Sequence, residues 1–169
     1  EVQFDHEVVL LVVRHGRGTT LCEPIGYRQE DGEFLEAWQP QPMSDAALAL
    51  ARGTARAVAE AIGEHGVFAV ELFVRGDDVI FNTASARPHE AGLVTLVSQD
   101  LSQFALQVRA SLGLPVPAPT IISAGAVHSV LSAGDVQNLA FAGLDDALGH
   151  PGTQLPVSYT HLRAHETVV

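Results

Sequence analysis

Residues 67–74 form a short apolar run that constrains the fold more than any other part of the sequence. A run of this length between turn residues predicts a buried β-strand. A second strand-like run, 79–84, follows the pair Gly76-Asp77, a combination typical of a β-hairpin. The first run contains one carboxylate, Glu71, and its burial is costly unless it is paired or binds a cation. The hairpin is therefore expected to provide both core and a functional site.

The register of this hairpin decides which side chain lies opposite Glu71. A two-residue turn would place Asn82 there, and a three-residue bulged turn would place Thr83 there. Either register puts a short polar side chain beside the carboxylate, and hard oxygen donors of this kind suit Mg²⁺. An outward-facing Glu71 on a half-exposed strand is the alternative.

The remaining segments show strand and helix patterns in no regular βαβ order. Strand-like patterns at 3–13 and 19–22, with a turn pair at Asp31-Gly32, predict an antiparallel meander. The later segments are expected to be a helix at 44–63, a helix from about residue 100, a Pro-rich connection at 115–119, a strand at 120–131 and a short helix at 144–148. This grouping predicts an α+β fold with a largely antiparallel sheet flanked by helices.

The spacing of apolar residues also predicts the buried face of each longer helix. In the first helix, which Ser44 is expected to cap, the core-facing residues would be Leu48, Ala51, Ala55, Val58 and Ile62. In the second helix, Gln103 is placed for a capping box. Its core-facing residues would be Leu101, Phe104, Ala105, Val108 and Leu112.

Charge and cysteine content exclude several classes of protein. Nine basic residues against 20 acidic ones give a net charge of −11. This balance argues against nucleic acid or an anionic membrane as the main partner, because both need a basic face. A single cysteine, Cys22, rules out an intrachain disulfide framework. No apolar run reaches the roughly 18 residues needed to span a bilayer, so a cytoplasmic location is the default expectation.

Two further groups of polar residues are candidates for a binding site. Residues 86–92 follow directly after the hairpin and contain Arg87 and His89. These side chains offer an anion a planar donor fork and a ring N–H. Gly92 would allow the backbone to approach closely. Glu7, on the first strand, is suited to accept hydrogen bonds from ribose hydroxyls. A solvated loop and a surface carboxylate are the respective alternatives.

Several sequence blocks together resemble one enzyme family. The blocks are 23–32, 36–44, 66–74, 87–89 and 92–102. In combination they closely resemble formate-dependent phosphoribosylglycinamide formyltransferase, the ATP-grasp enzyme of the third step of purine synthesis. The resemblance runs from Val2 to about Leu155. It implies that residues 1–114 form the later part of an ATP-grasp domain and that residues 115–155 begin a small carboxy-terminal domain.

The resemblance implies an ATP-dependent enzyme that uses Mg²⁺. ATP would phosphorylate formate to formyl phosphate, and the amine of glycinamide ribonucleotide would attack that acyl phosphate. The implied partners are small molecules, namely formate, glycinamide ribonucleotide and ATP. Neither nucleic acid nor a membrane is expected as a partner, and a homodimer of the full-length enzyme is left open.

The resemblance also assigns roles to individual positions. It implies that Glu71 is the first Mg²⁺ ligand and that Arg87 and His89 are the catalytic anion-binding pair. For ATP, it implies that Glu7 is the ribose carboxylate and that Val2 lies in the segment whose backbone recognises adenine. Glu90 stands where the family has an Asp that contacts the glycinamide substrate.

One departure from the family pattern leaves two other functions open. The family has a second Mg²⁺ carboxylate twelve residues after the first, whereas this chain has Thr83. A neutral hydroxyl supplies less charge, so metal affinity is expected to fall. A degenerate nucleotide-binding paralogue is therefore one alternative. The other is a carboxyaminoimidazole ribonucleotide synthase, which shares the Arg-Pro-His loop but uses bicarbonate.

The two ends of the sequence suggest a partial enzyme. Residues 156–169 resemble a translated sequencing adapter and are expected to be a non-native tail, with a natural polar tail as the alternative. His161 and His165 within it are therefore not interpreted as a metal site. The chain starts at Glu1 and lacks the lysine segments that hold phosphate in the family. This chain by itself is accordingly expected to be inactive.

Overall fold

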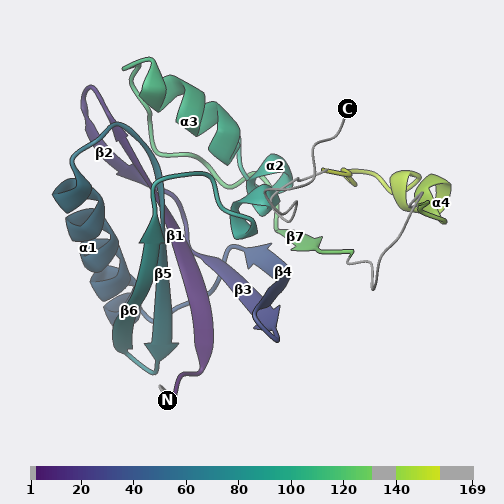
Figure 1. Cartoon of the computed structure of the whole chain (residues 1–169), viewed down its shortest axis with the longest axis horizontal. Helices are drawn as coiled ribbons and strands as arrows, with labels where there is room; N and C mark the ends of the chain where they lie inside the picture. Colours follow the sequence, from purple (N-terminus) through teal and green to yellow (C-terminus); the bar gives the residue numbers. More distant parts are fainter. Residues whose placement is uncertain (1–2, 131–139, 157–169) are drawn as a thin grey trace, which may run out of the picture. The chain divides into compact units, whose positions relative to one another are not determined.

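The computed structural model describes residues 3–130 and 140–156 (Figure 1). The chain divides into two compact units, Glu1–Gly134 and Asp135–Val169, which are described separately. The first unit holds a seven-stranded sheet in the order β6-β5-β1-β3-β4-β7, with β2 paired to β1 outside this path. The strands are β1 His6–His15, β2 Gly18–Leu21, β3 Ile25–Glu30, β4 Glu33–Gln39, β5 Gly66–Arg75, β6 Asp78–Ser85 and β7 Gly125–His128.

Strand pairing in the described residues is antiparallel throughout, which confirms the predicted α+β fold and antiparallel sheet. β1 lies inside the sheet, with β5 along one edge and with β3 and β2 sharing the other. The predicted hairpin of β5 and β6 is present, and the predicted turn at Asp31-Gly32 joins β3 to β4. Asp31 and Gly32 adopt positive φ, at 51° and 82°, which matches the twist that a two-residue hairpin turn requires.

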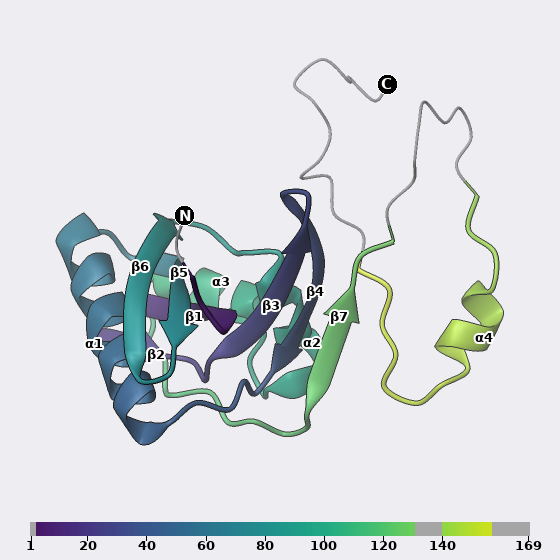
Figure 2. The same cartoon turned by 90° about the horizontal axis from the view of Figure 1, so that it is seen from below.

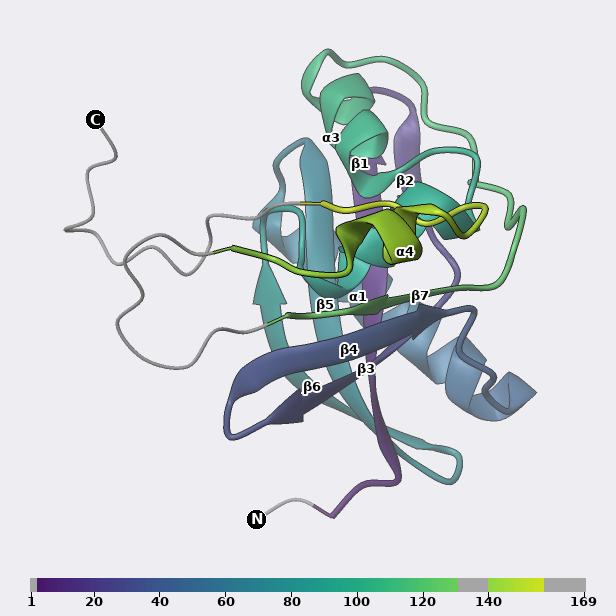
Figure 3. The same ribbon diagram turned by 90° about the vertical axis from the view of Figure 1, so that its right-hand side faces the viewer.

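Helices cover the two faces of the sheet. Helix α1 (Asp45–Ile62) packs on one face, whereas η1 (Ala91–Val94), α2 (Thr95–Ser98) and α3 (Gln103–Ser111) pack on the other (Figures 2 and 3). Helix α1 begins as predicted, because the Ser44 hydroxyl accepts a hydrogen bond of 3.1 Å from the Ala47 N–H. It ends at Gly63, which adopts φ 86°.

The buried stripe of α1 differs in part from the predicted one. Its fully buried residues are Ala47, Ala51, Ala55 and Ala59. Of the predicted residues, Ala51 and Ala55 are therefore correct, Leu48 and Val58 are only half-buried, and Ile62 is exposed. Four alanines at a spacing of four lie along the side that faces the strands, and their small side chains let the helix axis come close to the sheet.

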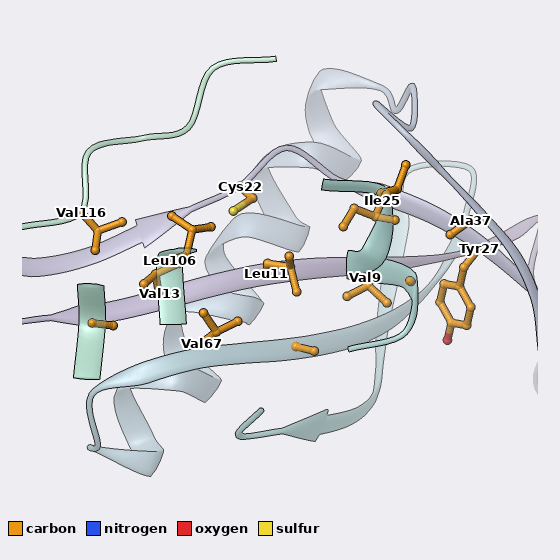
Figure 4. Packing of buried hydrophobic residues seen from close by; sticks show 14 of the residues in the cluster. Val9, Leu11, Val13, Cys22, Ile25, Tyr27, Ala37, Val67, Leu106 and Val116 are labelled. Carbon is orange, nitrogen blue, oxygen red and sulfur yellow. The ribbon is translucent and has the colours of Figure 1, made fainter. Parts of the chain in front are cut away.

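Two apolar clusters flank β1. One contains the alanines of α1 and the even-numbered residues Val8, Leu10 and Val12. The other contains the odd-numbered residues Val9, Leu11 and Val13 of β1 (Figure 4) together with Leu106 and Ala110 of α3. All six residues from Val8 to Val13 have 0% exposure. Because each buried aliphatic side chain contributes about 1.5–3 kcal/mol, β1 supplies a large share of the core of the first unit.

The buried face of α3 is not the predicted one. The helix begins at Gln103, and its N-cap is Ser102, whose hydroxyl accepts a bond from the Ala105 N–H. Gln103 is thus the first helical residue and does not form a capping box. Of the expected inward residues, Phe104, Val108 and Leu112 are 43%, 58% and 68% exposed. Ala105 is half-buried, and Leu101 precedes the helix and packs against the apolar cluster as predicted. The residues that do face the sheet are Gln103, Leu106 and Ala110.

The carboxy-terminal segments follow the predicted order, with changed lengths. β7 covers Gly125–His128 and pairs with β4, so the strand is shorter than the predicted 120–131, of which residue 131 lies outside the described residues. In the second unit, α4 (Leu144–Leu148) forms where the short helix was predicted. The domain boundary predicted after residue 114 stays a prediction. None of the helices in residues 3–130 and 140–156 has the length and apolar character needed to cross a bilayer.

Candidate active site on the α3 face of the sheet

The hairpin of β5 and β6 places Thr83 opposite Glu71 by a route that neither predicted register contained. The turn itself has two residues, because Arg75 pairs with Asp78. Further along, Leu72 pairs with Phe81 and Glu71 pairs with Thr83, so Asn82 is an extra residue that forms a β-bulge. The bulge shifts the register by one residue, next to the carboxylate.

The Glu71 carboxylate is buried and both of its oxygens have partners. The Tyr27 hydroxyl donates a hydrogen bond of 2.8 Å to Oε2. The His89 Nε2 lies 3.2 Å from Oε1. Glu71 is 9% exposed, so the alternative of an outward-facing side chain is wrong. A buried carboxylate with two donors is the arrangement that physical chemistry requires at this position.

These contacts keep Glu71 ionised. The hydrogen bond from His89 is the largest cause of a lowered pKa for Glu71, and the Tyr27 hydroxyl and the Arg87 charge act in the same direction. Burial opposes them but does not prevail. Glu71 is therefore a negatively charged oxygen donor at neutral pH.

The hydrogen bonds of His89 define which ring nitrogen carries the proton in its neutral form. Nδ1 accepts a bond of 3.2 Å from the Ala91 N–H. The proton then resides on Nε2, which faces Glu71 and donates to it. The ring also contacts Tyr27 edge to face, with 6.1 Å between the ring centroids. The side chains of Glu71 and Tyr27 and the backbone N–H of Ala91 together fix the His89 ring.

Glu7 lies on the same face of the sheet as Glu71. It pairs with Tyr27 of β3 on one side and with Phe73 of β5 on the other, while Glu71 pairs with Val9. Burial and, second, the charge of Glu71 raise the pKa of Glu7, while the Tyr27 hydroxyl lowers it. The pKa of Tyr27 is itself raised by burial and by both carboxylates, so its hydroxyl stays protonated as a donor.

The other predicted site residues lie on or near the 86–92 loop. Arg87 is exposed, and its Nη1 donates to the Pro88 carbonyl at 3.4 Å. Glu90 is half-buried and directly precedes η1. Thr83 is exposed beside Glu71. The adenine-binding role predicted at Val2 falls outside the described residues. The structure thus brings Glu71 and His89 into contact and places Glu7, Thr83 and Arg87 around them.

Two residues of this site have no local signal in the sequence. Tyr27 lies at one end of the apolar cluster in Figure 4 and donates to Glu71 from a strand 44 residues earlier in the chain. Gln103 is hydrogen-bonded to the backbone of His89. Gly92 serves a different purpose from the predicted one, because a Cβ built there would overlap the side chain of Gln103. It makes room for a side chain and not for a ligand's approach to the backbone.

The donor set suits a hard cation that brings most of its own ligands. Within residues 3–130 and 140–156, no three or more His, Cys, Asp or Glu side chains gather in a way that could enclose a metal ion. Glu71 supplies one ionised carboxylate and Thr83 one hydroxyl from the paired strand. Such a pair fits Mg²⁺, which commonly takes one or two protein oxygens together with water and phosphates.

The fold that holds these residues is that of a known family. The family model for the ATP-grasp domain matches residues 1–104, so the chain belongs to the ATP-grasp family. A relative from Marinobacter nauticus, the formate-dependent phosphoribosylglycinamide formyltransferase, is 53% identical over 154 residues, which cover 91% of this chain and 40% of the relative. The resemblance found in the sequence is therefore confirmed. The chain spans about 40% of the length of the curated relatives that it matches.

Two solved structures show the same fold. The glycinamide-RNase-transformylase T from Mycobacterium tuberculosis is 42% identical, with a TM-score of 0.70, over 75% of this chain and 37% of the other. The N5-carboxyaminoimidazole ribonucleotide synthetase from Thermus thermophilus is 34% identical, with a TM-score of 0.69, over 75% of this chain and 36% of the other. Both enzyme types considered from the sequence thus have this architecture.

Proposed function

We propose that this chain carries part of the nucleotide- and metal-binding site of an enzyme that activates formate with ATP and formylates glycinamide ribonucleotide. One observation carries the proposal: the ionised Glu71, with Tyr27 and His89 on its two oxygens, lies within the ATP-grasp region. The 53% identity to the formate-dependent phosphoribosylglycinamide formyltransferase of Marinobacter nauticus supports formate as the substrate.

The proposed reaction has two steps. In the first, a formate oxygen attacks the γ-phosphorus of ATP, the bond to the bridging oxygen breaks, and formyl phosphate and ADP result. In the second, the amine of glycinamide ribonucleotide attacks the formyl carbon, phosphate leaves and the amine loses a proton. Both steps depend on placing anionic groups in line and on stabilising the charge that they develop.

Glu71 and Thr83 are the residues that would hold Mg²⁺ in this site. When bound, the ion neutralises negative charge that develops on the transferred phosphoryl group. The bond from His89 keeps Glu71 deprotonated for this role, and Tyr27 orients its second oxygen. Because Thr83 is neutral, this pair of residues supplies one negative charge, and its metal affinity is expected to be weak without phosphate ligands.

The surrounding side chains suit the two anionic substrates. The exposed guanidinium of Arg87 offers a planar donor fork to a carboxylate or an acyl phosphate. Glu7 would accept hydrogen bonds from the ribose hydroxyls of ATP. Glu90 would contact the glycinamide part of the second substrate, with a side chain one methylene longer than the Asp of the family pattern.

A chimeric enzyme tests this proposal. The matching segment of the Marinobacter nauticus relative would be replaced by the 154 aligned residues of this chain, and ADP release would be followed with ATP, formate and glycinamide ribonucleotide. The expected result is release that depends on both formate and glycinamide ribonucleotide. In the chimera, Glu71→Gln should reduce the rate of ADP release roughly 100-fold or more, because losing a direct metal ligand should cost at least as much as losing a residue that only hydrogen-bonds to a ligand.

Two other candidate functions have specific support. The likeness in fold to a carboxyaminoimidazole ribonucleotide synthetase supports that reaction, and the neutral Thr83 opposite Glu71 supports a degenerate nucleotide-binding protein. The same chimera separates the candidates. Turnover with bicarbonate and aminoimidazole ribonucleotide in place of formyl transfer would indicate the synthase reaction. A folded chimera that binds ATP without turnover of either kind would indicate a degenerate nucleotide-binding protein and contradict the proposed formyl transfer.

A further inference from the structure

Gln103 is a buried polar residue that the proposed reaction does not use. It is 1% exposed and lies on the face of α3 that packs against the sheet. A primary amide in such a position is costly unless its donors and acceptor are satisfied. Both ends of the Gln103 amide bind the same residue. Oε1 accepts a bond of 2.9 Å from the His89 N–H, and Nε2 donates a bond of 2.9 Å to the His89 carbonyl.

The surroundings fix the Gln103 side chain in this position. The Thr95 hydroxyl accepts a bond of 2.8 Å from the Gln103 N–H and donates one of 2.6 Å to the Gly92 carbonyl. Gly92 has no Cβ where one would overlap the Gln103 amide. The start of α3 and the end of the 86–92 loop are thus joined around one side chain. Neither Thr95 nor Gln103 has access to solvent in which to find other partners.

We propose that Gln103 is a positioning residue that holds the backbone of His89 so that the imidazole Nε2 meets Glu71. An amide that bonds to both the N–H and the C=O of one residue acts as a neighbouring β-strand would, and it restricts the φ and ψ angles of that residue. The bond from the Ala91 N–H to Nδ1 then sets the ring. The importance of the His89–Glu71 contact for catalysis rests on the proposed function, whereas the hydrogen bonds of Gln103 to His89 do not.

The first test compares two equally buried glutamines by NMR of the full chain at one fixed pH. In the starting protein, cross-peaks between the Tyr27 and His89 rings and the ¹⁵N shifts of the His89 ring report ring position and tautomer. Gln103→Leu should lose most of the cross-peak intensity. Gln39→Leu is the matched control. Gln39 is also 1% exposed, donates a bond of 2.8 Å to the Glu23 carbonyl and accepts one from the Ser98 hydroxyl, and neither partner belongs to the 86–92 loop.

A stability role alone would give a different result. Both leucine variants should lower the melting temperature, but only Gln103→Leu should change the His89 signature. Unchanged cross-peaks and shifts in Gln103→Leu would overturn the proposal, and so would an equal change in Gln39→Leu.

A conservative variant covers the case in which Gln103→Leu does not fold. Gln103→Glu keeps an acceptor for the His89 N–H and, when ionised, has no donor for the His89 carbonyl. At pH 8 it should show cross-peaks of intermediate intensity. Full intensity in Gln103→Glu at that pH would contradict a need for both bonds. Because these measurements contain no nucleotide and no formate, a chimera without formyl transfer would refute the proposed function and leave this result intact.

Discussion

Glu71 and Glu7 lie on one face of the sheet, and their surroundings drive their protonation in opposite directions. Hydrogen bonds, first from His89, lower the pKa of Glu71, whereas burial and the charge of Glu71 raise the pKa of Glu7. Tyr27 is close to both and stays protonated. Pairs of carboxylates separated in this way take different roles in active sites. Here the more acidic one, Glu71, is the one suited to a cation.

The lowered pKa of Glu71 predicts a loss of stability in acid. A carboxyl whose folded pKa is below its unfolded value stabilises the fold above that unfolded value, about 4.3 for Glu, and the stabilisation is lost as pH falls through the folded pKa. Urea unfolding between pH 7 and pH 3 should show this decrease in the free energy of unfolding. Glu71→Gln should show a smaller decrease over the same range. An identical decrease in both proteins would mean that Glu71 is not the group responsible.

The Thr83 position predicts a gain of metal affinity on substitution. Thr83→Glu adds a second carboxylate directly opposite Glu71, and the charge of the ligand set tunes affinity for hard cations. Calorimetry of the chimera should show that Thr83→Glu tightens Mg²⁺-ATP binding roughly 10-fold, which is the size of effect that substitutions around a metal site commonly have on metal affinity. Asn82→Glu is the control, because the bulge residue has no partner position on β5. No gain from Thr83→Glu would show that another residue already fills the ligand position.

At the scale of elements, α1 depends on small side chains. Ala55 is fully buried against the sheet, while Ala57 on the same helix is exposed. Ala55→Leu should therefore overpack the interface and cost about 1–3 kcal/mol, whereas Ala57→Leu should stay within about 0.5 kcal/mol of the starting protein. Denaturant unfolding of both variants measures this. Equal free energies of unfolding for the two variants would contradict the close packing of α1.

Local sequence signals were sufficient for most element boundaries and insufficient for the details of the site. Ser44, Gly63 and the turn pair Asp31-Gly32 mark ends of elements by their own chemistry, so those boundaries were predictable. The bulge at Asn82 has no such signal, because it depends on how β6 pairs with β5. The buried face of α3 was mispredicted because Gln103 faces inward for partners 14 residues away. The spacing of apolar residues along a helix carries no information about such distant hydrogen-bond partners.

For the whole molecule, Cys22 offers a reporter of global unfolding. It is 1% exposed, and burial raises its pKa to about 12. Reaction with iodoacetamide needs the thiolate, so the native protein at pH 8 should react slowly and only through opening of the fold. The same protein in guanidinium chloride is the control and should react as a free thiol does. A native rate close to the denatured one would show that the core around Cys22 opens locally.

The position of β1 in the sheet also has a consequence for the order of folding. The hairpins β1–β2, β3–β4 and β5–β6 join residues close in sequence, but the pairing of β1 with β5 joins Val9 to Glu71, after more than 60 intervening residues. Closing so long a loop is entropically costly and is repaid only when the apolar residues of both strands are covered. The three hairpins should therefore form early, and the β1–β5 pairing should form late. Until then, the edge of β1 that pairs with β5 stays open, and its continuous apolar stretch is able to pair with a wrong partner.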